Sequence, residues 1–91
     1  MLEVRVAKKF KKNYKLAQKR GFDISLIDNV IRALANEESL EPVYQDHQLK
    51  GKLRDYRECH ITPDWLLVYK IEKKILTLTL INTGSHADLF G

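Results

Sequence analysis

Three histidines, His47, His60 and His86, are the residues of this chain with the clearest capacity for chemistry. An unperturbed imidazole has a pKa of about 6.5, so it can both accept and donate a proton near neutral pH. All three lie in the second half of the chain, outside the apolar stripes that mark a core. A lone histidine is usually a surface or structural residue, and spacing alone leaves open whether these three converge on one site.

The strand expected around His60 adds charged groups to one of its faces. Because successive side chains of a strand alternate between faces, Arg54, Glu58 and His60 are expected together on a polar face that suits an anion. Cys59 falls on the apolar face and is interpreted as a small buried hydrophobic residue. Since Cys59 and His60 point to opposite faces, they are not expected to bind one ion, and no metal site is predicted.

Positive charge is concentrated at the N-terminus. Residues 1–20 contain eight Lys or Arg and one acid, a balance of +7, whereas residues 21–91 contain eight basic and eleven acidic residues, a balance of −3. A helix here places lysines in like-charge i,i+4 pairs, each of which costs roughly 0.2–0.5 kcal/mol. This repulsion favours contact with a polyanion such as nucleic acid over a merely solvated face. The lysines expected to bind substrate are Lys8, Lys11, Lys12 and Lys15.

Length and composition restrict the class of protein. Ninety-one residues, 44% hydrophobic and 31% charged, suit a single globular domain over residues 1–91. No apolar run approaches the ~20 residues of a membrane span, and the N-terminus lacks the layout of a signal peptide. One cysteine cannot form an internal disulfide. We therefore expect a cytoplasmic protein without membrane association and without a cofactor.

The first half of the chain is expected to form a strand and a helical hairpin. Residues 2–6 alternate, which predicts a strand with Leu2, Val4 and Val6 facing inward. Apolar residues at helical spacing predict one helix over 7–20, which ends at Gly21. A second helix over 24–34 is predicted to be capped by Asp23.

The second half of the chain is expected to form most of the sheet. Residues 40–51 are polar and irregular and are interpreted as a loop. Strands are predicted over 53–61, 65–72 and 75–82, and their tight connections favour antiparallel neighbours. Ser85 and Asp88 have the spacing of a capping box, which indicates one helical turn at the end. Helices on one face of a mainly antiparallel sheet define an α+β fold.

Three segments resemble a known family when they are taken together. They are Tyr44-Gln-Asp-His-Gln-Leu-Lys-Gly51, Tyr56 to Lys70, and Thr83-Gly-Ser-His-Ala-Asp-Leu-Phe90. These segments resemble the YafQ-type toxins of bacterial type II toxin–antitoxin systems, which belong to the RelE superfamily. The resemblance covers essentially the whole chain, and it is specific because three motifs occur in order at matching spacing.

The resemblance implies an mRNA interferase. Toxins of this type enter the decoding site of the ribosome and cut translated mRNA, and a cognate DinJ-like antitoxin silences them by wrapping around them. It further implies a toxin that is monomeric when free. Glu58 stands where the best-known member has aspartate, and the histidines fit the YafQ branch better than the RelE branch, which relies on Lys and Arg. The residues that fall on functional positions of the family are His47, His60, Asp64, His86 and Phe90.

The residue chemistry agrees with RNA cleavage that needs no metal. The 2′-OH of RNA attacks the neighbouring phosphorus, which requires a base, an acid at the departing 5′-oxygen and positive charge at the phosphoryl oxygens. We assign His47 or Asp64 as base and His86 as acid, with His60 and Arg54 at the phosphate. Phe90 is expected either to stack on a base or to plug the core.

Two alternatives to a ribosome-dependent ribonuclease remain open. A ribosome-independent ribonuclease would use the same residues on naked RNA. A non-catalytic module that binds RNA or a protein partner would need the lysines, but not three histidines at these positions.

Overall fold

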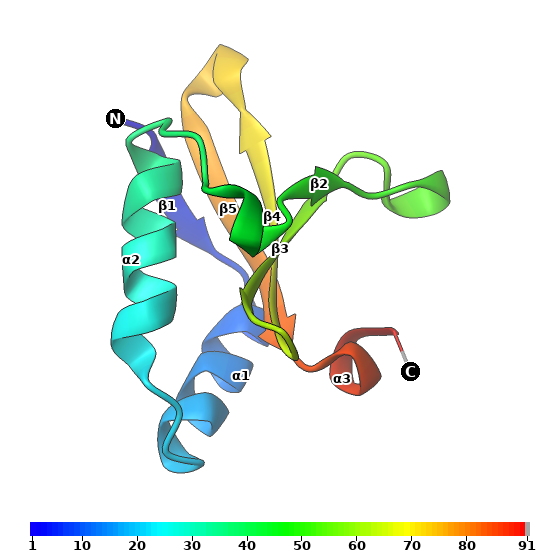
Figure 1. Cartoon of the computed structure of the whole chain (residues 1–91). Helices are drawn as coiled ribbons and strands as arrows, with labels where there is room; N and C mark the ends of the chain where they lie inside the picture. The colour runs from blue at the N-terminus through cyan, green and yellow to red at the C-terminus, as the bar shows by residue number, and fades with distance from the viewer. Residues whose placement is uncertain (91) are drawn as a thin grey trace.

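A five-stranded sheet in the order β1-β5-β4-β3-β2 forms the centre of the fold (Figure 1). The computed structural model describes residues 1–90. Strand β1 runs parallel to β5 and the other neighbouring strands are antiparallel, so the predicted α+β class is confirmed. The elements are β1 (Glu3–Val6), α1 (Lys8–Lys19), α2 (Ile24–Ala35), η1 (Pro42–Tyr44), β2 (His47–Gln48), η2 (Gly51–Leu53), β3 (Arg57–Thr62), β4 (Trp65–Glu72), η3 (Lys73–Ile75), β5 (Thr77–Gly84) and α3 (His86–Phe90).

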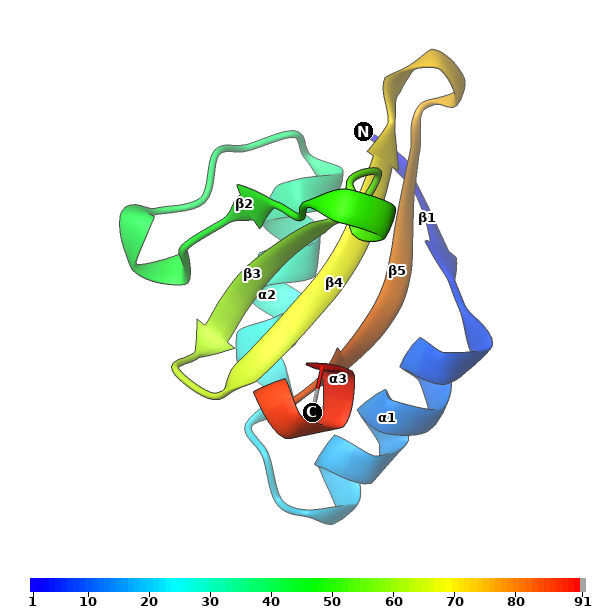
Figure 2. The same cartoon turned by 90° about the vertical axis from the view of Figure 1, so that its right-hand side faces the viewer.

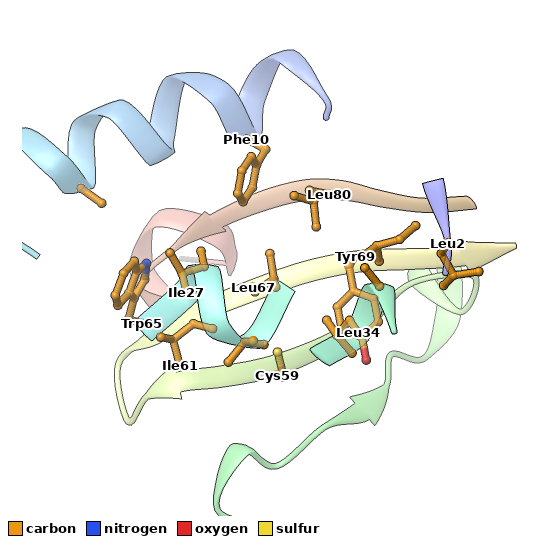
Figure 3. Packing of buried hydrophobic residues seen from close by; sticks show 14 residues of the cluster. Leu2, Phe10, Ile27, Leu34, Cys59, Ile61, Trp65, Leu67, Tyr69 and Leu80 are labelled. Carbon is orange, nitrogen blue, oxygen red and sulfur yellow. The ribbon is translucent and has the colours of Figure 1, made fainter. Parts of the chain in front are cut away.

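Helices α1 and α2 pack on one side of the sheet, and the short helix α3 lies at the end of β5 (Figures 1 and 2). Phe10 of α1 and Ile27 of α2 are buried against the strands (Figure 3). The predicted cap is present, because the Asp23 side chain accepts a hydrogen bond from the Ser25 amide at 3.1 Å. None of these helices is long and apolar enough to cross a membrane, within residues 1–90.

The central strand β4 carries the largest part of the core. Trp65 is 3% exposed, and its indole N–H donates to the Thr83 hydroxyl at 3.0 Å, so this residue belongs to the core. Cys59 of β3 is also fully buried, as predicted, and burial raises the pKa of its thiol to about 12.

Two predictions, one for β1 and one for β5, are wrong. Leu2 is buried as expected, but Val4 and Val6 are each 40% exposed, because β1 is an edge strand covered on neither face at these positions. The last strand begins at Thr77 instead of Ile75 and extends to Gly84. Leu76 is excluded from it, since this residue has a left-handed φ of 50° that closes the β4–β5 turn.

The segment between α2 and β3 also differs from the prediction. Residues 40–51, interpreted as a loop, contain the edge strand β2, which pairs with β3 and places His47 opposite Glu58. Strand β3 begins at Arg57 and not at residue 53, because η2 and a turn occupy the preceding residues. The alternation expected from Arg54 to His60 therefore holds only from Glu58 onward.

Candidate active site

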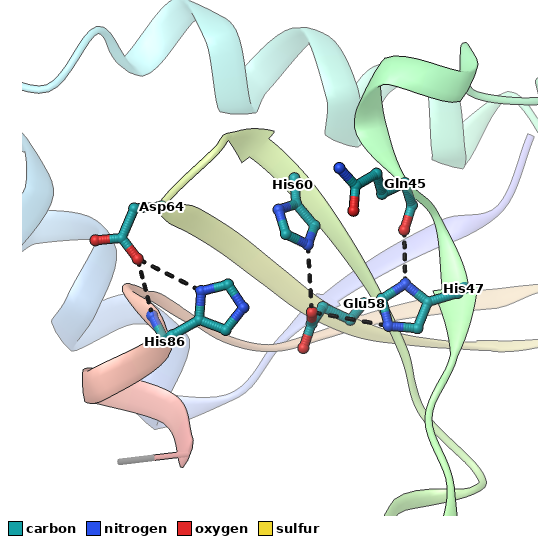
Figure 4. A network of polar contacts seen from close by, with 6 residues as sticks. All are labelled: Gln45, His47, Glu58, His60, Asp64 and His86. Atoms are coloured by element: carbon teal, nitrogen blue, oxygen red, sulfur yellow. Dashed lines mark hydrogen bonds and ion pairs between the residues drawn. The ribbon is translucent and has the colours of Figure 1, made fainter.

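Three histidines and two carboxylates form one row that runs along β3 toward the β3–β4 turn and α3 (Figure 4). The row begins at His47 on β2, passes through Glu58 and His60 on β3, and ends at His86 of α3 with Asp64 of the β3–β4 turn. Segments that are up to about forty residues apart in the sequence thus supply neighbouring side chains. The structure therefore brings the three predicted histidines together.

His47 is held so that one ring nitrogen remains available. Its Nδ1 lies 2.6 Å from the Gln45 carbonyl oxygen, and a carbonyl only accepts, so Nδ1 carries the hydrogen. In the neutral ring, Nε2 then has a free lone pair, and it lies 3.8 Å from a Glu58 carboxylate oxygen. This tautomer suits a group that accepts a proton.

Asp46 anchors the segment that carries His47, and the sequence alone did not identify it. The Tyr69 hydroxyl donates to its carboxylate, and the Arg57 guanidinium lies 3.4 Å from it. Burial and this carboxylate raise the pKa of Tyr69, so the phenol remains a donor. The only signal in the sequence was the position of Asp46 next to His47.

Glu58 is the shared partner of two imidazoles. Its side chain is 6% exposed, and one carboxylate oxygen lies 3.6 Å from His60 Nε2 as well as 3.8 Å from His47 Nε2. A buried carboxylate is costly unless it is paired, so Glu58 depends on these two imidazoles as its nearest polar partners. It thereby fixes the two rings relative to each other.

His86 faces His60 from the first turn of α3. The ring centroids are 5.6 Å apart, and the rings meet edge to face. One oxygen of Asp64 lies 3.4 Å from His86 Nδ1 and 3.3 Å from the His86 amide nitrogen. Both groups are largely exposed, so this pair contributes little to stability, but it orients Nε2 of the ring away from Asp64.

A capping box holds α3 in place, as the spacing of Ser85 and Asp88 predicted. The Ser85 amide donates to the Asp88 carboxylate at 3.0 Å, and the Asp88 amide donates to the Ser85 hydroxyl at 3.1 Å. The hydrogen bond from the Ser85 backbone holds the pKa of Asp88 below its usual value. The helical turn that presents His86 is therefore fixed at its first residue.

Other predicted site residues lie outside this row. Arg54 lines a separate cleft with Gln48, because it precedes β3 and does not share the face of His60. Phe90 is 49% exposed on α3, so it does not plug the core. The four lysines of α1 that were predicted to bind substrate are exposed, and no carboxylate of residues 1–90 lies within 4.0 Å of their amines.

Glu58, His60 and His86 also have the donor atoms of a metal site. One ligand atom from each lies within 4.8 Å of the others. Ligand atoms around a tetrahedral zinc ion lie about 3.4 Å apart, since each bond is about 2.1 Å, so these side chains would have to move closer together to bind an ion. In the sequence, only Cys59 with His60 was weighed as a pair of metal ligands. Glu58, His60 and His86 were not identified as a set, because Glu58 and His86 come together only in the folded chain.

Two clefts flank the row of histidines. His60 lines a cleft of about 350 Å³ with residues of η1 and the β3–β4 turn. Asp64 lines a cleft of about 430 Å³ on the other side, between α1 and α3. A chain molecule that crosses the histidines thus has room for a group on either side.

Sequence comparison assigns this α+β domain to a class of bacterial toxins. The family model described as the bacterial toxin of type II toxin–antitoxin system, YafQ, matches residues 2–91. The mRNA interferase toxin YafQ of Escherichia coli K12 is 39% identical over 90 residues, which cover 98% of this chain and 96% of that protein. The chain belongs to the YafQ toxin family.

Solved structures support the same assignment. A metal-bound toxin from Helicobacter pylori is 51% identical with a TM-score of 0.93 and covers 99% of this chain and 100% of that one. The E. coli DinJ–YafQ complex contains a chain that is 37% identical with a TM-score of 0.92, at full coverage of both. A copper-bound mutant toxin from H. pylori is 43% identical with a TM-score of 0.93, at 99% and 100% coverage.

Proposed function

We propose that this toxin is an endoribonuclease that cuts translated mRNA on the ribosome by attack of the RNA's own 2′-OH. The observation that carries the proposal is the row of His47, His60 and His86, with carboxylates at 3.4 to 3.8 Å from the imidazole nitrogens. The relatives named mRNA interferase toxin support the choice of RNA as substrate.

The order of the row suggests the role of each histidine. An in-line displacement at phosphorus needs its base and its acid on opposite sides. His47 and His86 occupy the two ends, and His60 lies between them (Figure 4). We assign His47 as the base that takes the 2′-OH proton, His86 as the acid that protonates the 5′-oxygen, and protonated His60 as the donor to the phosphoryl oxygens.

Asp64 is assigned to orient the acid, not to act as the base. Its carboxylate faces His86 Nδ1, so it stabilises the protonated ring and directs the Nε2–H toward the leaving oxygen. The exposed 3.4 Å pair is expected to become stronger when bound RNA excludes water. Asp64 could not hold this orientation and accept the 2′-OH proton in the same step.

The remaining predicted residues are assigned to RNA binding around this centre. Phe90, half-exposed on α3, stacks on a splayed base. Lys8, Lys11, Lys12 and Lys15 contact phosphates of mRNA or ribosomal RNA. Arg54 contacts the RNA backbone at its own cleft instead of the scissile phosphate.

A metal is not required for this chemistry. Glu58, His60 and His86 would hold a divalent ion, which would supply Lewis acidity at the same position. The metal would, however, occupy imidazole nitrogens that the proton transfers need. The H. pylori toxins described as metal-bound and copper-bound support binding of metal by this fold.

We further propose that a DinJ-like antitoxin silences the toxin in a hetero-oligomer, and that the free toxin is a cytoplasmic monomer. The E. coli relative in complex with DinJ supports this partner. The exposed lysines of α1 offer a basic surface to an acidic segment of such an antitoxin.

The test is to incubate the purified protein with a defined mRNA, with and without ribosomes. The proposal expects cleavage only on translated message, and 5′ fragments that end in a 2′,3′-cyclic phosphate or a 3′-phosphate. Equal cleavage of naked RNA would favour a ribosome-independent ribonuclease. RNA binding without cleavage in either condition would favour the non-catalytic module.

A further inference from the structure

The cleft of about 430 Å³ between α1 and α3 has no role in the proton transfers described above. Helix α1 supplies Leu16 to its wall, Arg20 follows at the C-cap of this helix, and Phe22 comes from the turn before α2. Asp64 and Asp88 supply two carboxylates from the opposite side. The cleft thus combines apolar, cationic and anionic groups beside His86.

The apolar wall of this cleft is partly open to solvent. Leu16 is 38% exposed and Phe22 is 41% exposed, and the Phe22 ring meets Trp65 edge to face at 5.1 Å. Exposed aromatic and aliphatic side chains that line a polar cleft suit a flat, partly apolar ligand. A nucleobase is such a ligand, and its faces can pack on these side chains.

The charged side chains that line the cleft favour the base of a nucleotide over its phosphate. Two aspartates against one arginine leave a formal charge of −1, so this cleft repels a phosphate group. Carboxylates accept hydrogen bonds only, so they attract an edge that donates hydrogen bonds. The base of a nucleotide therefore suits the interior, and its phosphate suits Arg20 or the solvent.

The two aspartates are not equivalent as acceptors. One oxygen of Asp64 already faces the His86 amide and ring. Asp88 uses one oxygen for the Ser85 amide, and this carboxylate keeps further lone pairs. Asp88 lies two residues beyond His86 in α3, so a base on Asp88 belongs to a nucleotide next to the scissile phosphate.

We propose that this cleft is a base subsite in which Asp88 binds guanine, through its adjacent N1–H and N2–H groups, at a nucleotide neighbouring the cut. Guanine offers two parallel donors to one carboxylate, whereas adenine, cytosine and uracil each offer fewer on that edge. Phe22 and Leu16 pack on the base. Arg20 contacts the phosphate of the same nucleotide or stacks on the face of the base. This inference rests on the proposed function for its RNA substrate.

Binding to the whole chain tests the subsite without any cleavage. We expect guanosine monophosphate to shift the NMR signals of Phe22 and of the Arg20 guanidinium, and to do so at lower concentration than the other three mononucleotides. Arg20→Gln should weaken this binding. Lys19→Gln is the matched control, since Lys19 loses the same charge one residue earlier but does not line the cleft.

Cleavage on the ribosome gives the second test. Messages that differ only by guanosine or inosine beside the cut site remove the N2 amino group alone. We expect guanosine to be preferred by on the order of 10-fold. Asp88→Asn keeps an oxygen for the Ser85 amide but presents a donor, so it should abolish this preference.

The outcomes separate the subsite from the proposed function. Cleavage with equal rates for guanosine and inosine, and equal binding of the four mononucleotides, would overturn the subsite and leave the ribonuclease intact. Selective binding of guanosine monophosphate without RNA cleavage in any condition would support the subsite and overturn the ribonuclease. An Asp88→Asn protein that keeps the full guanosine preference would also overturn the assignment of Asp88.

Discussion

Gly84 and Asp88 approach so closely that a side chain at position 84 has no room. A Cβ built on Gly84 would lie 2.9 Å from the Asp88 Cβ and 3.0 Å from an Asp88 carboxylate oxygen. The same carboxylate accepts the Ser85 amide that begins α3. The missing side chain of Gly84 therefore allows the turn that carries His86 to pack against the end of β5.

Replacement of Gly84 should displace His86, which is assigned as the general acid. In Gly84→Ala, the new methyl group must push Asp88 away, which breaks the capping box and moves His86. We expect cleavage to fall by on the order of 10²-fold, the usual cost of a misplacement of about 1 Å. Amide chemical shifts should change in α3 and leave α2 unaffected. Unchanged shifts in α3 together with full activity would contradict this role of Gly84.

His86 should be needed only when the leaving group needs a proton. His86→Ala is expected to slow cleavage of ordinary RNA by about 10²–10⁴-fold. With a sulfur in place of the 5′-oxygen, the leaving group is a stable anion, and the variant should recover most of this loss. His47→Ala should lose the same factor in rate, relative to the wild type, on both substrates, because His47 is assigned as the base and does not act on the leaving group. If the sulfur substrate did not rescue His86→Ala, the acid would have to be another residue.

Added metal should inhibit the enzyme instead of activating it. The proton transfers need free imidazole nitrogens, and Glu58, His60 and His86 can hold one ion. We expect cleavage to persist in the presence of a chelator and to fall when Zn²⁺ is titrated in. Glu58→Gln should bind zinc more weakly, as seen by calorimetry, because the amide is a poorer ligand than the carboxylate. Loss of cleavage in chelator, restored by a divalent ion, would indicate a metal-dependent nuclease.

The lysines of α1 should control the salt dependence of binding. Lys11, Lys12 and Lys15 changed together to Glu should weaken ribosome binding and flatten its salt dependence, because fewer counterions are released. The pairs 8–12 and 15–19 then join opposite charges, whereas positions 11 and 15 stay alike, so stability should be equal or slightly higher. The control changes Lys52, Lys73 and Lys74 to Glu, which reverses the same charge on η2 and η3. The same loss of affinity in both variants would indicate only an effect of net charge.

Tyr14 should make part of the stability depend on alkaline pH. Its hydroxyl donates to Asp28 at 2.8 Å, and burial together with Asp28 raises the pKa of Tyr14 to about 12. A raised pKa means that the fold favours the neutral phenol. Its contribution is therefore complete below about pH 10, the ordinary pKa of tyrosine, and is lost as pH rises toward about 12.

The measurement compares the wild type with Tyr14→Phe. The difference in their free energies of unfolding should be constant up to about pH 10 and decrease between about pH 10 and about pH 12. Tyr69 and Cys59 are present in both proteins, so their titration cancels in the difference. A difference that did not change over this range would show that the Asp28 contact has no effect on the phenol.

The order of residues was sufficient to predict the class of the fold and the family of the chain. Helical periodicity located α1 and α2 to within a residue or two, because each helix needs an apolar stripe and a local stop such as Gly21. Strand β4 was located at both ends, since it is apolar on both faces and bounded by turn residues. These signals are local, so they can be read without knowledge of the tertiary structure.

The side chains that meet in the site could be identified only in the folded chain. Strand β2 is two residues long and has no pattern of its own, yet its pairing with β3 places His47 opposite Glu58. The turn at η2 removes Arg54 from the face that alternation had given it. The shared carboxylate of Glu58, the Asp64–His86 contact and the cleft beside Asp88 all join segments far apart in the chain. Such contacts depend on strand register and on the path of the turns. Both are set by packing across the whole domain, so no local stretch of sequence predicts them.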